Sequence, residues 1–92
     1  MRFRGSRGRW RDGVVVLDAS FLEEATRRIL RAALRLLWRR EGWPMGGMGL
    51  DDWEAAARVC LGEETARDFP GGTRVRRSQG MVRVGAISED RP

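Results

Sequence analysis

The sequence has no histidine, lysine, tyrosine or asparagine, and it has a single cysteine among 92 residues. Without histidine, and with Cys60 alone, the chain has no Ser–His–Asp triad, no zinc-finger ligand set and no internal disulfide framework. Its apolar runs are also short. Runs such as Val14–Leu17 fall far below the length of a membrane span or a signal-peptide core. We therefore expect a small, soluble, basic domain in the cytoplasm, with no membrane partner.

All 18 basic residues are arginine, against 13 acidic residues, and the formal net charge is +5. Arginine in place of lysine is typical of a GC-rich genome, so the placement of charge is more informative than the residue type. There are 11 arginines and five acidic residues in 1–42, two and six in 43–69, and five and two in 70–92. Two basic ends around an acidic middle favour association with nucleic acid, although an acidic lipid surface or an acidic partner would also fit.

The N-terminal half predicts an arm, a strand and one long helix. Residues 1–12 combine arginines with glycine and serine, which is typical of a flexible basic arm. The β-branched run 13–18 predicts a buried strand. The spacing of Ser20 and Glu23 fits a capping box, and it precedes a helix over 21–41. On a helical wheel the apolar residues fill an arc of roughly 220°, so we expect this helix to be covered on most of its circumference.

The C-terminal half predicts a second helix and a hairpin. The helix runs over 51–61, with its inner face formed by Trp53, Ala56, Ala57 and Cys60. A sharp turn follows at 70–72, and the segments 73–77 and 81–84 flank a hairpin turn. The expected fold class is α+β, with two main helices plus a small antiparallel β-hairpin or sheet, and it is mostly helical. We expect one domain over 13–87, whose sheet the strand 13–18 could join, and a disordered tail over 88–92.

Three features could indicate chemistry, but each has a simpler explanation. The glycine-rich stretches 45–49 and 70–73 lack the spacing of a Walker or dinucleotide-binding loop, so we interpret them as turns. Acidic residues around Asp51 and Glu63 could offer oxygen ligands to Mg²⁺, yet a solvated acidic face explains them better. Cys60 has no histidine to activate it and fits a core position.

The arginines of helix 21–41 are the main candidates for a binding surface. They recur one turn apart, and a tryptophan among them offers a ring on which a base or ribose could stack. If this stripe and the hairpin share one face, they would form a phosphate-contacting surface with salt-sensitive affinity; a solvated helix face is the alternative. The candidate nucleic-acid-binding residues are Arg27, Arg28, Arg31, Arg35, Trp38, Arg74, Arg76 and Arg77. No catalytic or metal-binding residue is assigned.

Two segments, Glu24–Leu34 and Arg67–Arg77, together resemble the region after the catalytic domain of bacterial tRNA(Ile)-lysidine synthetases. That family shows a short strand, an "RR-x-L-R" helix, a second helix, and an "L-P-G-G" turn into a strand with "V-x-R". Here the double arginine is Arg27-Arg28, followed by Arg31. The turn and strand motifs correspond to Pro70-Gly71-Gly72, Val75 and Arg77, with Phe69 where leucine is usual.

The resemblance implies tRNA as the partner. Such enzymes use ATP to adenylate the wobble cytidine of an isoleucine tRNA with a CAU anticodon, and they then attach lysine. The ATP chemistry belongs to a PP-loop domain with an S-G-G-x-D-S signature, which this chain lacks. The resemblance therefore implies a tRNA-recognition part without catalysis of its own, with ATP and Mg²⁺ expected only in the catalytic domain. Two alternatives remain: an interaction module that docks on a separate PP-loop chain, and a truncated, non-functional relic.

Overall fold

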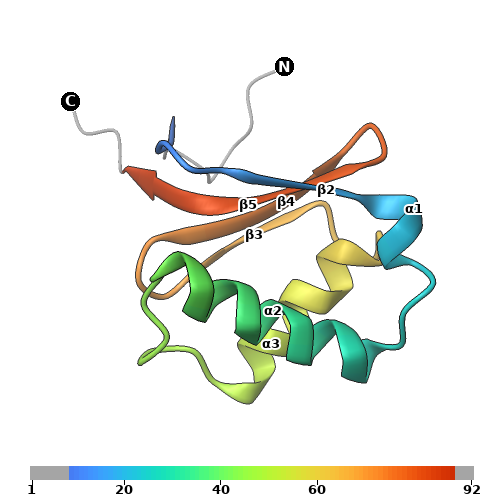
Figure 1. Ribbon diagram of the computed structural model, residues 1–92, viewed down its shortest axis with the longest axis horizontal. Helices are drawn as coiled ribbons and strands as arrows, with labels where there is room; N and C mark the ends of the chain where they lie inside the picture. Colours follow the sequence, from blue (N-terminus) through green and yellow to red (C-terminus); the bar gives the residue numbers. More distant parts are fainter. Residues whose placement is uncertain (1–8, 89–92) are drawn as a thin grey trace.

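The computed structural model describes residues 9–88, which form two layers, a sheet with helices against one of its faces (Figure 1). No helix within this range is long and apolar enough to cross a membrane. The elements, in chain order, are β1 (Arg9–Trp10), β2 (Val15–Asp18), α1 (Ala19–Leu22), α2 (Arg27–Glu41), α3 (Leu50–Cys60), β3 (Ala66–Phe69), β4 (Thr73–Ser78) and β5 (Met81–Ser88).

The sheet is larger than the sequence predicts. Helices make up 38% and strands 30% of the described chain, and five strands form one antiparallel sheet. The prediction of a mostly helical domain with two helices and a small hairpin is therefore wrong. It missed β3 because the residues of this strand, Ala66–Phe69, do not alternate in polarity. It missed β1 because Arg9–Trp10 lies inside the predicted arm 1–12. Arm residues 1–8 and tail residues 89–92 lie outside the described range.

Strand β5 pairs with more strands than any other described strand of the sheet. It pairs with β4 along one edge and with both β2 and β1 along the other, while β3 pairs with the far side of β4. The predicted hairpin is confirmed: Gln79 and Gly80 form a two-residue turn with φ of 53° and 78°, the signature of a type I′ turn. This turn sets Val75 opposite Val84 on the face that α2 and α3 cover.

The predicted helix over 21–41 is broken near its start. Asp18 caps the short α1 by accepting the Ser20 N–H at 2.9 Å, and Thr26 caps α2 by accepting the Ile29 N–H at 3.2 Å. The Ser20–Glu23 capping box is not formed, because Glu23 ends α1 and pairs with Arg77 of β4. The break lets the chain turn from the sheet edge to the helical layer.

The core is built around Trp38 of α2. Its ring makes edge contacts with Trp43 and Trp53 at 5.2 Å and with Phe69 at 6.1 Å between centroids. The predicted inner face of α3 is confirmed, since Trp53, Ala56, Ala57 and Cys60 are all buried. Only a narrow stripe of α2 is fully buried, namely Leu30, Leu34 and Trp38.

Much of the remaining apolar arc of α2 faces outward, although Leu37 packs partly buried against the core. Ile29 is 58% and Leu36 61% exposed. The expectation that the helix is covered on most of its circumference is therefore wrong, because α3 packs on the arginine side of α2 and leaves the opposite apolar side open.

Candidate nucleic-acid interface

The first arginines of α2 face the acidic helix α3 and the segment after it. Arg31 donates to Glu54 at 2.8 Å, and Arg27 donates to Glu54 at 3.1 Å and also pairs with Glu63. The hydrogen bond to Glu63 raises the pKa of Arg27. Glu54 of the acidic helix α3 therefore lies against the arginines of α2 and not on a face turned away from them. Two of the candidate residues thus hold helices together.

The aromatic candidate on α2 is not accessible. Trp38 is fully buried, so it cannot stack on a base as the sequence suggested. Arg35 lies over the ring of Trp53, with its guanidinium carbon 5.6 Å from the centroid, which is a cation–π contact. Arg28 is exposed on the outer side of α2.

Alternation along β4 separates its three arginines. Arg77 points toward the helical layer, where it donates to the Cys60 carbonyl at 2.8 Å and pairs with Glu23. Arg74 points to the outer face, the side of the sheet away from α2 and α3. It is 4% exposed, and its side chain donates to Asp68 at 2.7 Å. The guanidinium carbon of Arg74 also lies 5.6 Å from the centroid of the Trp10 ring.

The outer face also holds two arginines side by side. Arg76 and Arg83 are Cα partners in the antiparallel β4–β5 pair, and both are half-buried. Arg76 was among the candidate residues; Arg83 was counted with the hairpin arginines but not listed as a candidate, and Trp10 was not considered. The signal for Arg83 was present, because a two-residue turn at 79–80 fixes the register that sets residue 76 opposite residue 83.

The candidate arginines therefore do not form one surface. The α2 set lies in the helical layer (Figure 1), whereas Arg74 and Arg76 alternate along β4 with Val75, which faces the helices, and so point to the opposite side of the sheet. The expectation that helix and hairpin share one phosphate-contacting face is wrong. The outer face gathers Arg74, Arg76 and Arg83 beside Trp10, with Asp68 as the partner of Arg74.

Most of the acidic positions considered as Mg²⁺ ligands accept from arginines instead, and Asp52 caps a helix. Glu64 accepts from Arg58 at 2.7 Å and from Arg67 at 3.0 Å, and the hydrogen bond from Arg58 lowers the pKa of Glu64. Asp52 accepts the Gly49 N–H at 2.8 Å and caps α3. Within residues 9–88 there is no group of three or more metal-ligating side chains.

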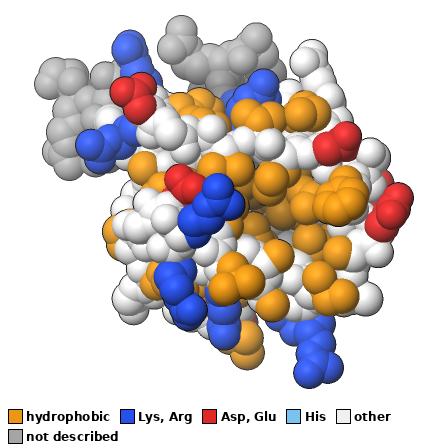
Figure 2. Space-filling view, viewed as in Figure 1, with side chains coloured by type: hydrophobic (Ala, Val, Ile, Leu, Met, Phe, Trp, Pro, Cys, Tyr) orange, Lys and Arg blue, Asp and Glu red, His pale blue; other side chains and the backbone are white. Residues whose placement is uncertain are grey.

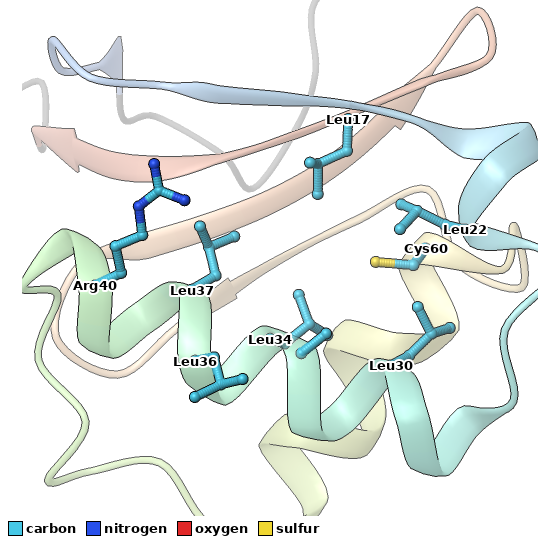
Figure 3. A pocket seen from close by; sticks show the side chains of 9 residues that line it. Leu17, Leu22, Leu30, Leu34, Leu36, Leu37, Arg40 and Cys60 are labelled. Carbon is cyan, nitrogen blue, oxygen red and sulfur yellow. The ribbon is translucent and has the colours of Figure 1, made fainter.

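An apolar groove of about 290 Å³ opens between α2 and β2 (Figures 2 and 3). Leucines of β2, α1 and α2 line it, among them Leu17, Leu22 and Leu37. Cys60 also lines it and is buried, and burial raises the pKa of this thiol to about 11.

The buried thiol predicts a slow alkylation reaction. A pKa near 11 in place of the ordinary value leaves about one hundredth as much thiolate at pH 8, so iodoacetamide should label native Cys60 at least about 100-fold more slowly than the urea-unfolded chain. Mass spectrometry reports this residue alone, because it is the sole cysteine. Equal rates in the two states would contradict the prediction.

The same pKa shift has a consequence for stability. The unfolded thiol loses its proton first, so the free energy of unfolding should fall as pH rises from about 9 to about 11 and should be insensitive to Cys60 below that range.

Comparisons with protein-family models, curated proteins and solved structures gave no match for this chain.

Proposed function

We propose that this chain is a tRNA-binding domain of the tRNA(Ile)-lysidine synthetase type, and that the outer face of its sheet contacts the RNA backbone. The observation that carries this proposal is the cross-strand pair of Arg76 and Arg83. Both side chains project from the same face of the sheet on neighbouring strands, so that one phosphate can contact both guanidinium groups. Each guanidinium can donate two hydrogen bonds to one phosphate.

The surroundings of the pair fit an RNA ligand. Trp10 lies on the same face, beside Arg74, and its ring packs over Gly85, where an added Cβ would lie 3.4 Å from the ring. Antiparallel sheets with one face covered by helices and the other bearing aromatic and basic side chains suit the stacking and backbone contacts of single-stranded RNA.

The resemblance to lysidine synthetases adds support from chain order. The double arginine begins α2, the proline–glycine turn joins β3 to β4, and Val75 and Arg77 follow in β4. On this proposal the domain recognises tRNA and catalyses nothing alone, while ATP and Mg²⁺ are bound by a PP-loop catalytic domain.

The test is tRNA affinity of an Arg76→Ala/Arg83→Ala double variant. We expect affinity for an isoleucine tRNA with a CAU anticodon to fall about tenfold or more at low salt, and the slope of log K against log salt to fall by about two. Fluorescence anisotropy at several salt concentrations measures both quantities.

The matched control removes two arginines from the exposed side of α2, in Arg28→Ala/Arg39→Ala. We expect this variant to bind nearly as well as the wild type. A selective loss in the control would place the RNA on the helical layer, and equal losses in both variants would indicate unspecific attraction. Undetectable binding by the folded wild-type chain at low salt would overturn the proposal. Arg27 and Arg31 are unsuitable for such a test because they hold Glu54.

A further inference from the structure

The groove between α2 and β2 continues into an exposed apolar stripe on α2. Ile29, Ala33 and Leu36 are exposed and recur at helical spacing, and Leu36 and Ala33 also line the groove. Figure 2 shows this region as a nearly continuous apolar area between the sheet and the helical layer. A contiguous apolar surface of this kind marks an interaction site in a small protein.

On the sheet side, the groove is lined by β2, which is an edge strand among the described strands. Strand β2 pairs with β5 on one side, and none of the described strands pairs with its other side. Leu17 of this strand points into the groove, whereas Val16, which is 49% exposed, lies opposite Arg83 on the outer face of the sheet. A free edge strand can extend its sheet by pairing with a strand from another chain, and antiparallel pairing about a two-fold axis is one way to do so.

The two ends of the groove have opposite charge. Leu22 lines one end and is followed by Glu23, which pairs with Arg77, and by the exposed Glu24. Arg40 lines the other end, beside Arg39; its side chain is 83% exposed, and its Nε lies 3.9 Å from a carboxylate oxygen of Glu41. Figure 3 shows Leu22 and Arg40 at opposite ends of the cavity.

We propose that a second copy of this chain covers the groove, in a two-fold symmetric dimer. An axis normal to the sheet, between two β2 edges, places the α2 helices antiparallel and brings the apolar stripe of one against the stripe of the other. The acidic end of each groove then faces the basic end of its partner, so the surface is complementary to itself. This proposal does not depend on RNA binding.

The test uses two charge reversals, Glu24→Arg and Arg40→Glu, followed by analytical ultracentrifugation. We expect a concentration-dependent dimer for the wild type and at least tenfold weaker self-association for each variant, because each homodimer would place like charges together twice. In an equimolar mixture the two variants should form a heterodimer of near wild-type affinity, since both contacts become attractive. Circular dichroism melts check that the variants remain folded.

The matched control is Arg28→Glu, which makes the same charge change at an exposed position of α2 that does not line the groove and should leave self-association unchanged. A wild type that stays monomeric up to millimolar concentration would overturn the proposal. A mixture of the two variants that fails to associate would also overturn it, because the dimer would then use another surface. If the monomer instead binds a PP-loop catalytic chain and Arg40→Glu abolishes that binding, the groove belongs to that partner.

Discussion

Replacing Trp38 by alanine should destabilise the domain by about 3–5 kcal/mol, because it removes the largest fully buried side chain and leaves a cavity. Three aromatic rings contact this indole edge-on, from the loop after α2, from α3 and from β3. A chain of 92 residues has a total stability of about 5–14 kcal/mol. The variant should therefore lose a large part of its folding free energy.

Thermal unfolding followed by circular dichroism measures the effect, and Tm should fall by about 12 °C or more. Trp38→Phe is the matched variant. It keeps an aromatic ring and removes the buried Nε1–H, which has no hydrogen-bond partner in the described part of the chain. Because an unsatisfied buried donor costs about 1–3 kcal/mol, this variant should be much closer to wild type than alanine is. If the Trp38→Ala chain kept the wild-type Tm but bound RNA weakly, this prediction would be contradicted. The hypothesis that Trp38 stacks on an RNA base would then be the better explanation.

The sequence predicts best those elements whose signals are local. The turn at Gln79–Gly80 and the buried face of α3 depend on residues near in sequence, and both are confirmed. The break before α2 was missed because helix-forming residues continue through 23–25, and only Thr26 marks a new start. Strand β3 was missed because its residues, Ala66–Phe69, become a strand only by pairing with β4.

The candidate site was less predictable than the fold, because it depends on which elements pack together. A helical wheel predicts that Arg27 and Arg31 lie on the same side of α2. It does not predict that Glu54 of α3 lies against them. The opposition of Arg76 and Arg83 follows from the turn register and could have been predicted. The position of Trp10 could not, since β1 exists only through its pairing with β5.

Two prolines pack on two glycines where the loop before α3 meets the β3–β4 turn. An added Cβ on Gly71 would lie 2.7 Å from Pro44 Cβ, and one on Gly47 would lie 2.9 Å from Pro70 Cβ. Proline rings are stiff, so neither contact can relax by a simple rotation. Gly71 also has a φ of +89°, a conformation that alanine adopts only with strain, whereas Gly47 has no positive φ.

We expect Gly71→Ala to cost about 2–4 kcal/mol, since it combines backbone strain with overlap. Three other alanine substitutions separate the effect of backbone strain from the effect of steric overlap. Gly47→Ala adds overlap alone, Gly80→Ala adds strain at φ +78° alone, and Gly46→Ala adds neither. Urea unfolding should rank Gly71→Ala as the most destabilised and Gly46→Ala as neutral or slightly stabilised, because alanine restricts the unfolded chain. If Gly71→Ala destabilises the fold no more than Gly80→Ala does, the overlap with Pro44 has no energetic cost and close packing against Pro44 does not stabilise the fold. The contact between Trp43 and Trp38 would then hold the loop before α3 in place.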